Sequence, residues 1–402
     1  MDKFKGKRLL ILGAGRGQIG LYKAAHELGI TTIAGTMPDN DPPCISLADE
    51  VCYMNILNPD EVELKTRELL FDGVATCCLD MGLKALGRLC DLRQLPGYSE
   101  NTADLCNNKL LAKKRFLECG VSTAAFKKIS TIPELQTAVN EIGGYPVIIK
   151  ATDLAGSMGI YKAENEQQAL DGFKKAMEAT RQDYIIVEQF LSGKEFGAQA
   201  FIQNGEIIFI MPHGDILFHA STDIPVGHFV PYQMSDTLSE KVYCEASKAI
   251  KAMELDNCAV NIDFIAVGNE LYVLELSGRI GANGLPEVVS AYFGIDYYKM
   301  AILAALGEPV RLIWDTRKTN KATLARMIIS PSHNGILKNI EYTGINYPEI
   351  FEMLLFARPG TTVHKFENSS HCLGQVIITS DTIDKCDSIA REVLDHIKID
   401  LA

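Results

Sequence analysis

Short apolar runs and amphipathic stretches alternate over the first hundred residues. The runs at 8–12, 31–34, 50–54 and 73–77 have the length and composition of strands, and the stretches at 59–70 and 83–92 have helical spacing. A glycine-rich turn separates the first strand from the first helix. This alternation is typical of a doubly wound α/β sheet. We therefore predict a small Rossmann-like α/β domain over residues 1–105.

The pattern changes near residue 106. A charged helix is predicted over 103–119, closed by a glycine at 120. It is followed by strand-like runs with few helices between them, at 145–150, 184–189, 196–203, 207–211, 260–267 and 271–276. This order favours an α+β domain with antiparallel sheets. A helix at 297–306 and the turn 307–309 end that domain, so its predicted extent is 106–309.

The last segment, 310–402, has strand-like runs at 322–329, 353–357 and 375–380 and an amphipathic helix at 383–397. We predict a small α+β domain there. The fold class expected for the whole chain is thus an α/β N-terminal domain, a central α+β domain and a small α+β C-terminal domain.

Charge and composition exclude several classes of protein. Among 402 residues, 39 are basic and 51 acidic, and a net charge of −12 disfavours a broad nucleic-acid surface. The densest apolar run, 300–306, is far shorter than the ~20 residues of a membrane helix. The eleven cysteines contain no Cys-x-x-Cys pair. We expect a reduced, cytoplasmic chain with no secretion signal and with neither nucleic-acid nor membrane partners.

The front turn, Gly15-x-Gly17-x-x-Gly20, matches the dinucleotide-binding fingerprint. That fingerprint also needs an acidic residue at the end of the second strand, where this chain has Gly35-Thr36, and Asp39 comes only later. Two interpretations stay open. The loop either belongs to an NAD(P)-dependent oxidoreductase or is a tight turn needed for packing or lining a small cleft. The missing acid favours the second.

Two lysines and a glycine-rich loop suggest phosphate binding. Lys109 lies early in a predicted helix, and Lys150 ends the run 147–149. An ammonium group at the edge of a buried strand needs an anionic partner, which is either a phosphate or a nearby carboxylate such as Asp153. The loop 153–160 follows directly, and its Gly156, Ser157 and Gly159 permit backbone N–H groups to converge on phosphate oxygens. A plain hairpin turn would use the same glycines.

A further segment, 187–195, runs from an apolar strand into a polar turn. Backbone groups near Glu188, Gln189 and Leu191 are candidates to pair with an adenine edge, and Glu195 is a candidate acceptor for ribose hydroxyls. The alternative is a solvated turn between strands.

Two acidic residues lie on neighbouring predicted strands. A two-residue turn at 268–269 would put Asp263 and Glu275 on opposite sheet faces, whereas a three-residue turn at 268–270 makes them direct cross-strand neighbours. We predict the three-residue turn. Two carboxylates about 5 Å apart repel each other unless a cation bridges them, and their hard oxygens suit Mg²⁺ held with phosphates. Ser277 and Arg279 continue along the same face. Acids on a solvated edge are the alternative.

Taken in order, these motifs resemble the ATP-grasp superfamily of carboxylate–amine ligases, with features like biotin carboxylase, carbamoyl phosphate synthetase and the L-amino-acid ligases. The resemblance covers about 108–307. The first domain resembles the substrate-binding domain that precedes ATP-grasp domains, and the last resembles the small C-terminal domain of the biotin carboxylase type. One departure is Glu275-Leu276-Ser277-Gly278-Arg279, where such families commonly have Glu-x-Asn-x-Arg. The number of metal ions is therefore open.

The resemblance implies an ADP-forming ligase that joins a small carboxylate, such as an amino acid, to an amine through an acyl phosphate. It implies ATP and Mg²⁺ as cofactors, with Mn²⁺ as an alternative ion, and a homodimer among the partners. Lys109 and Lys150 would neutralise phosphates, Asp263, Glu275 and Ser277 would hold metal, and Arg279 would act catalytically. His228, in 223–231, is a candidate substrate contact or a core histidine. A nucleotide-binding regulator without catalysis is the rival interpretation from another class.

Overall fold

The N-terminal part of the chain is an α/β unit. In the computed structural model, which describes residues 2–38, 42–154, 158–219, 223–314, 321–330 and 332–402, four parallel strands take the order β3-β2-β1-β4. The strands are β1 (Arg8–Leu12), β2 (Thr31–Thr36), β3 (Glu50–Tyr53) and β4 (Gly73–Ala75), and the helices are α1 (Ile19–Glu27), α2 (Pro59–Thr66) and α3 (Leu83–Arg93). The core of this sheet is mainly apolar, with Leu9 to Leu12 buried. The predicted parallel α/β sheet is confirmed.

The glycines of the front turn are explained by close packing. A Cβ atom at Gly20 would lie 2.2 Å from the ring of Tyr298, and one at Gly17 would lie 2.9 Å from the Cβ of Cys78. Neither position has room for a larger side chain. This is the packing interpretation of the turn. Asp39 lies outside the described residues.

The single helix predicted over 103–119 is wrong. The chain forms α4 (Glu100–Asn107) and α5 (Lys109–Glu118), separated by Asn108 with φ −123° and ψ 108°. The Asn108 side chain accepts hydrogen bonds from the N–H groups of Leu110 and Leu111, so it acts as the N-cap of α5. Asparagine is a weak helix former and a strong cap, which is why the break falls there.

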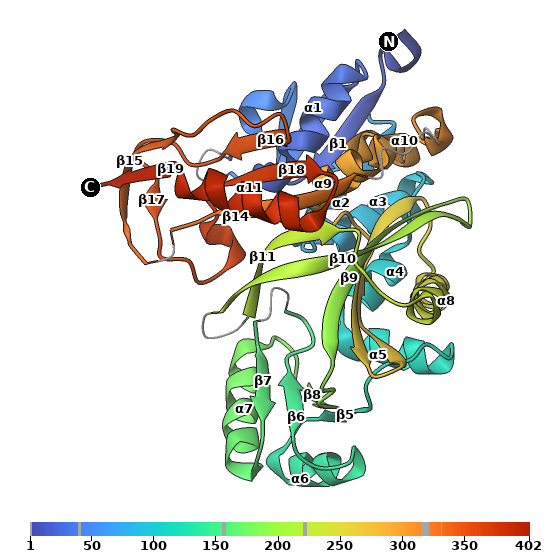
Figure 1. The fold of residues 1–402 in the computed structure, drawn as a ribbon. Helices are drawn as coiled ribbons and strands as arrows, with labels where there is room; N and C mark the ends of the chain where they lie inside the picture. The colour runs from blue at the N-terminus through green and yellow to red at the C-terminus, as the bar shows by residue number, and fades with distance from the viewer. Residues whose placement is uncertain (1, 39–41, 155–157, 220–222, 315–320, 331) are drawn as a thin grey trace.

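A small lobe follows, built on an antiparallel sheet of order β5-β8-β6-β7. Its strands are β5 (Phe126–Ile129), β6 (Val147–Lys150), β7 (Ile160–Ala163) and β8 (Ile185–Gln189), and its helices are α6 (Ile132–Glu141) and α7 (Glu166–Ala179). Apolar residues of both helices and all four strands form one core cluster. Figure 1 shows this lobe at the opposite end of the molecule from the N-terminal sheet.

The largest sheet is mainly antiparallel and, within the described residues, has eight strands in the order β13-β12-β9-β10-β11-β14-β18-β16. These are β9 (Lys194–Gln203), β10 (Glu206–His219), β11 (Asp223–Val230), β12 (Cys258–Val267), β13 (Glu270–Ser277), β14 (Ala322–Ile328), β16 (Ile350–Leu355) and β18 (Gly374–Ser380). Strand β14 pairs with β11, from Gly227 opposite Arg326 to Val230 opposite Thr323. The sheet therefore runs without a break across the domain boundary predicted at 309.

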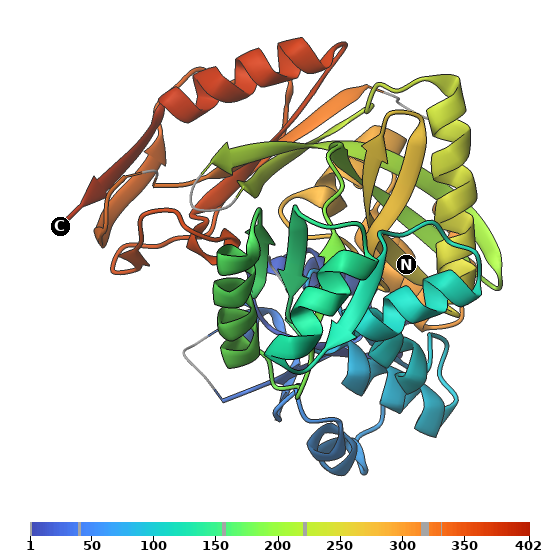
Figure 2. The same ribbon diagram turned by 90° about the horizontal axis from the view of Figure 1, so that it is seen from below.

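The remaining elements cover this sheet. Helix α8 (Asp236–Ala252) packs on β13 and β10, and α9 (Leu285–Phe293) packs on β11, β14 and β18. Helix α10 (Tyr297–Ala305) packs on β12 and on α1 and β4 of the N-terminal unit, and α11 (Ile383–Asp395) packs on β14 and β18 (Figure 2). A three-stranded sheet of β17 (Thr362–Val363), β15 (Gly335–Tyr342) and β19 (Ile397–Leu401) lies at the C-terminus. The sequence interpretation missed these three strands. None of the described helices is long and apolar enough to cross a membrane.

Candidate active site

The large sheet brings Asp263 and Glu275 together as predicted, but by a different route. Val267 pairs with Glu270, so the turn has two residues and the predicted three-residue turn is wrong. The register shifts by one residue between Asp263 and Phe264, and this bulge makes Asp263 pair directly with Glu275. Gly268 takes a φ of +59°, which suits a tight hairpin turn.

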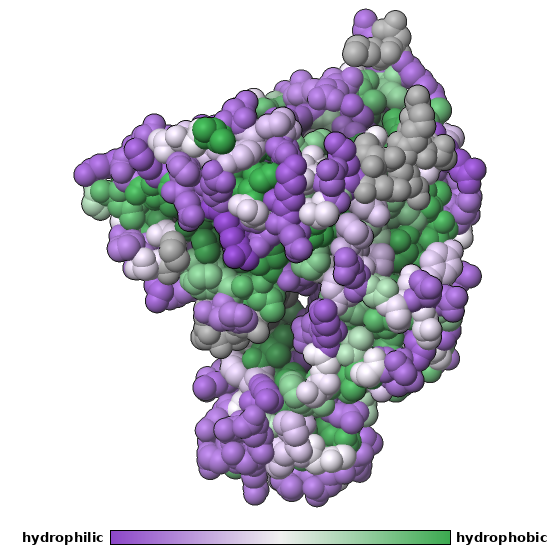
Figure 3. All heavy atoms as spheres, viewed as in Figure 1, coloured by the Kyte–Doolittle hydropathy of each residue, from purple (hydrophilic) through white to green (hydrophobic). Residues whose placement is uncertain are grey.

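The two carboxylates form an electronegative site on β12 and β13 of the large sheet. Figure 3 shows the molecule indented between the small lobe and the remainder. The Asp263 side chain is open to solvent, yet the surrounding protein and then the negative charges of Glu275 and Asp215 raise its pKa to about 7. One counter-charge is close, because Lys109 Nζ lies 3.5 Å from Glu275. The donor set of adjacent carboxylate oxygens fits a hard divalent cation such as Mg²⁺.

Lys109 also connects this site to the segment that follows β6. Its backbone N–H donates to the carbonyl of Thr152 at 3.0 Å, and its Nζ donates to the carbonyl of Leu154 at 2.7 Å. The capped N-terminus of α5 thus places the ammonium group between Leu154 and Glu275.

The second predicted lysine is part of a buried ion cluster that links the small lobe to helix α5. Lys150 Nζ lies 2.9 Å and Lys113 Nζ 3.3 Å from the same Glu188 oxygen, Oε2, and Lys113 also donates to Thr123 Oγ1 at 2.8 Å. Glu188 is 1% exposed and Lys113 is 2% exposed. Burial raises the pKa of Glu188, but the two ammonium groups outweigh it and the pKa lies below its usual value. Lys150 is therefore paired with a carboxylate, and that carboxylate is Glu188 and not Asp153.

The sequence interpretation missed Lys113. It follows Lys109 by four residues on α5, and this spacing places both side chains on one face of the helix. That periodicity was the available signal.

The loop after β6 is described only in part, because Gly156 and Ser157 lie outside the described residues. Gly159 has a φ of +68°, and a Cβ atom there would lie 2.8 Å from that of Ala151. Asp153 is anchored at the end of α7, where it accepts hydrogen bonds from Thr180 Oγ1 at 2.5 Å and from the N–H of Arg181 at 2.9 Å. Hydrogen bonds thus anchor the start of the loop at Asp153. At its other end the backbone takes a positive φ, which glycine adopts without strain at position 159.

The segment predicted to contact adenine and ribose leads from the small lobe to the large sheet. Gln189 ends β8 with its side chain exposed and its N–H bonded to the carbonyl of Ala125 at 2.8 Å, and Leu191 follows half-buried. Glu195 of β9 pairs with Ile265 of β12. Two residues further along β9, Gly197 pairs with Asp263. Glu195 and Asp263 therefore share one sheet face. Its charge also raises the pKa of Asp263.

Ser277 and Arg279 meet an aspartate from the N-terminal unit. Ser277 Oγ donates to Asp80 Oδ1 at 2.7 Å, and Arg279 forms a two-point pair with both Asp80 oxygens at 2.7 Å each. Burial raises the pKa of Asp80, but the Arg279 charge together with the hydrogen bonds from Arg279 and Ser277 outweighs burial, and that pKa is lowered. Sequence interpretation missed Asp80. It lies just after β4, at the carboxyl edge of a parallel sheet, where ligand-binding residues commonly gather.

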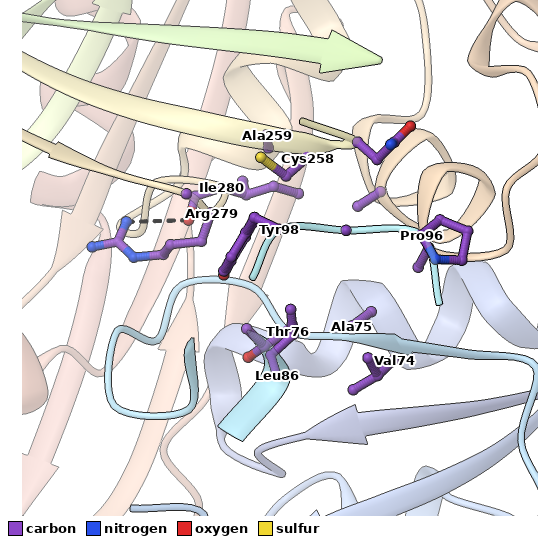
Figure 4. A pocket seen from close by; sticks show the side chains of 15 residues that line it. Val74, Ala75, Thr76, Leu86, Pro96, Tyr98, Cys258, Ala259, Arg279 and Ile280 are labelled. Atoms are coloured by element: carbon purple, nitrogen blue, oxygen red, sulfur yellow. Dashed lines mark hydrogen bonds between the residues drawn. The ribbon is translucent and has the colours of Figure 1, made fainter. Parts of the chain in front are cut away.

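A small cavity of about 40 Å³ lies behind this aspartate–arginine pair (Figure 4). It is bounded by β4 from one side and by Cys258, Ala259 and Ile280 from the other. The Tyr98 hydroxyl is buried nearby without a hydrogen-bond partner, and the Arg279 side chain extends away from the Tyr98 ring. The cavity is mostly apolar and is a packing feature of the interface between the N-terminal unit and the large sheet.

His228, the candidate substrate contact, is 5% exposed and belongs to a polar cluster on the large sheet. Its Nδ1 lies 2.7 Å from Asp215 Oδ1, and His213 Nδ1 lies 3.2 Å from the same oxygen. Neither His213 nor Asp215 was singled out from the sequence. His213 and Asp215 are two residues apart on β10, so their side chains lie on the same face of the sheet. Asp215 pairs with His228 on β11, which places all three side chains on that face.

Two family models match the chain. The model "Phosphoribosylglycinamide synthetase, ATP-grasp (A) domain" matches residues 107–271, and "L-amino acid ligase C-terminal domain 2" matches residues 327–402. A crystal structure of phosphoribosylglycinamide synthetase from Anaerococcus prevotii is 48% identical and covers 98% of this chain and 100% of its own, with a TM-score of 0.87.

More distant proteins share the fold. The L-amino acid ligase from Bacillus licheniformis is 18% identical, with 99% of both chains covered and a TM-score of 0.82. The biotin carboxylase domain of the Hydrogenobacter thermophilus 2-oxoglutarate carboxylase, solved as a dimer with MgADP and bicarbonate, is 19% identical, covers 98% of this chain and 91% of its own, and has a TM-score of 0.81. The uncharacterized protein y4rH of Sinorhizobium fredii is 24% identical. The match covers 78% of this chain and 65%, just under two thirds, of that relative.

Proposed function

Because this chain belongs to the ATP-grasp ligases, which join a carboxylate to an amine with ATP, we propose that it works on a small metabolite or amino acid through an acyl phosphate and releases ADP. The family predicted from the sequence is confirmed by these matches. The alternatives, a regulator without catalysis and an NAD(P)-dependent oxidoreductase, gain no support from them.

The observation that carries the proposal is the Asp263–Glu275 pair on the large sheet with Lys109 Nζ 3.5 Å from Glu275. Enzymes of this family use ATP with Mg²⁺, and Mg²⁺ neutralises the charge that develops on transferring phosphates. Asp263 and Glu275 would hold the ion. The Ser277 hydroxyl donates a hydrogen bond to Asp80. Its oxygen keeps two lone pairs and would stay available as a third metal ligand.

The remaining residues position ATP. Lys109 and Lys150 would supply ammonium groups, and the 153–160 loop, through Gly156, Ser157 and Gly159, would bring N–H groups to the phosphates. The end of β8, with Glu188, Gln189 and Leu191, would meet the adenine, and Glu195 the ribose. In the structure the Glu188 side chain is committed to Lys150 and Lys113, so its contribution to adenine binding would come from the backbone.

The chemistry runs in two displacements. A substrate carboxylate oxygen attacks the γ-phosphorus of ATP, the bond to the β–γ bridging oxygen breaks, and ADP leaves. An amine nitrogen then attacks the acyl carbon, phosphate leaves, and the nitrogen loses a proton to solvent. Arg279 would stabilise negative charge on the acyl phosphate. Asp80 fixes the orientation of its guanidinium group through two hydrogen bonds.

Amino acids are the proposed substrate class because the C-terminal 327–402 matches a domain of the L-amino acid ligases. A homodimer, Mn²⁺ as an alternative ion, a cytoplasmic location and domain limits at 105 and 309 stay predictions.

The test is a phosphate-release screen with ATP and Mg²⁺ over pairs of amino acids and small carboxylates. Phosphate and ADP should appear only when both members of a productive pair are present. With the carboxylate alone, hydroxylamine should replace the amine and give a hydroxamate, because it captures an acyl phosphate. Formation of AMP and pyrophosphate with a productive pair would contradict the proposal.

A further inference from the structure

The cluster of His213, Asp215 and His228 has a geometry that the ligase chemistry does not use. Each residue offers one ligand atom, and these atoms lie within 4.8 Å of one another. Both Nδ1 atoms approach one Asp215 oxygen, at 2.7 and 3.2 Å. Donors around a tetrahedral ion bound at 2.0–2.1 Å are spaced by roughly 3.4 Å. The 3.2 Å separation is close to that spacing, and the 2.7 Å separation is a hydrogen bond that a bound ion would replace.

Both imidazoles are buried and incompletely bonded. His213 is 2% exposed, and neither its Nε2 nor that of His228 has a hydrogen-bond partner. A buried nitrogen that bonds to nothing is costly, and an ion is one partner that would satisfy it. Each ring thus has two nitrogens that can bind a metal, Nδ1 beside Asp215 and the unbonded Nε2, and the ring centroids are 5.1 Å apart.

Gly197 permits this arrangement. A Cβ atom at Gly197 would lie 2.3 Å from Cε1 and 2.4 Å from Nε2 of His213. The His213 ring therefore lies over strand β9 at the one position without a side chain. Any other residue at 197 would push the ring away from its place beside Asp215.

We propose that His213, Asp215 and His228 bind a divalent transition-metal ion, with Zn²⁺ as the best fit, at a site separate from the ATP-bound Mg²⁺. Two imidazoles and one carboxylate are ligands that Zn²⁺, Mn²⁺ and Co²⁺ accept and that Mg²⁺ does not favour.

The two cation sites differ in position as well as in ligands. His213 and Asp263 both pair with Gly197 from opposite sides, so two strand spacings, about 10 Å, separate their backbones. The Asp263–Glu275 site offers only oxygen atoms, whereas the histidine cluster offers mainly nitrogen. Mg²⁺ would thus bind at the oxygen site and a softer ion such as Zn²⁺ at the histidine cluster. Metal binding at the histidine cluster does not depend on the acyl-phosphate chemistry.

The experiment measures metal binding by the full chain without ATP or substrate. Metal-free protein in excess Mg²⁺ is titrated with Zn²⁺ in competition with a chromophoric chelator, and in parallel with Co²⁺, whose visible absorption reports nitrogen ligation. We expect one tight Zn²⁺ per chain. His228→Gln should weaken that binding at least tenfold and remove the Co²⁺ absorption, because losing one of three ligands costs no less than losing a supporting contact.

A matched control comes from the surface. His364, which is exposed, and His371, which is half-buried, stack with centroids 5.0 Å apart and are the natural place for adventitious Zn²⁺. His371→Gln should leave the tight site unchanged. If His228→Gln fails to fold, Asp215→Asn, which keeps the side-chain volume, should give the same loss. No Zn²⁺ binding in the wild type, or binding that follows His371 and is indifferent to Asp215 and His228, would overturn the proposal.

Discussion

Two charged clusters shift the pKa of a carboxylate in opposite directions. In the first, called the lobe cluster, Glu188 and Lys150 of the small lobe meet Lys113 of α5, and the pKa of the buried Glu188 is lowered. On the sheet, Asp263 faces Glu275, and its pKa is raised to about 7. The difference shows that burial alone does not set protonation, because the neighbouring charges decide the sign.

The two clusters also carry net charges of opposite sign. The lobe cluster has two ammonium groups for one carboxylate. Its net charge is therefore +1, which would attract a phosphate. The sheet cluster has two acids against Lys109, so negative charge remains and a cation can use it. The two clusters are therefore complementary to the two components of MgATP.

The largest effect is expected at Glu275. Glu275→Gln replaces a charged metal ligand by a neutral amide oxygen and should reduce phosphate release by more than about a hundredfold, in line with the loss of several kcal/mol of charge stabilisation. Steady-state turnover at ordinary Mg²⁺ measures this. Glu270→Gln, an exposed residue of the same hairpin, is the control and should keep full turnover. Turnover of Glu275→Gln at the wild-type level would remove the metal role.

The lobe cluster should instead reveal itself in stability. Glu188→Gln leaves two buried ammonium groups without a charged partner and should lower the free energy of unfolding by about 3–5 kcal/mol. Urea unfolding measures this. Glu164→Gln, whose exposed pair with Lys162 should contribute less than about 1 kcal/mol, is the control in the same lobe. A Glu188→Gln variant as stable as Glu164→Gln would show that the cluster is not buried in solution.

Lys150 tests whether the lobe cluster also serves ATP. Lys150→Met removes a charge-assisted hydrogen bond worth about 1.5–3 kcal/mol and should weaken ATP binding by roughly ten- to a hundredfold. Calorimetric titration of folded protein gives the affinity. Lys127→Met, at the exposed pair with Glu141 in the same lobe, should leave ATP affinity unchanged. Equal affinities of the two variants would make Lys150 a purely structural residue.

The raised pKa of Asp263 predicts that both MgATP affinity and stability depend on pH. Its pKa of about 7 means that a proton competes with Mg²⁺ below neutrality, so affinity for MgATP should rise with pH and level off above about 7. In metal-free protein the folded state binds this proton more tightly than the unfolded state, whose pKa is ~3.9. The stabilisation is then complete below about pH 4 and is lost between about pH 4 and 7. Asp263→Asn should flatten both profiles, and unchanged profiles would contradict the raised pKa.

The smallest effect concerns the phosphate loop. Gly159→Ala places a side chain at φ +68° and should cost about 1 kcal/mol of stability and a few-fold in ATP affinity. In the wild type, hydrogen exchange over 153–160 should slow when a non-hydrolysable ATP analogue binds, as it does for segments that close over ligands. Protection that is already high and does not change on binding would make the loop a structural turn.

The sequence predicted those parts that depend on local periodicity. The parallel N-terminal sheet follows from alternating strands and helices, and the Asp263–Glu275 pairing follows from adjacent strands. The bulge that produces this pairing was not predictable, because nothing in the hairpin sequence distinguishes one extra residue in a strand from one in a turn. The Asn108 break was signalled by a capping residue but was hidden by helix-forming neighbours.

Contacts between distant segments could not be predicted. Asp80 and Arg279 are separated by 199 residues, and Lys150 and Glu188 by 38, so no local pattern links them. The Lys150 partner was expected to be either a phosphate or Asp153, and the structure selects Glu188 because β6 and β8 pair with Ile148 opposite Glu188. Pairing partners of this kind are set by tertiary packing.

The unbroken eight-stranded sheet also has a mechanical consequence. The β11–β14 ladder resists shear, so the C-terminal strands and the acidic pair should move as a single rigid body. Hinge bending would then be confined to the small lobe, which joins the rest of the chain through 119–125 and 190–193. Because His228 lies on β11 beside Ala325 of β14, the histidine cluster belongs to the stationary body, whereas Lys150 would travel with the lobe.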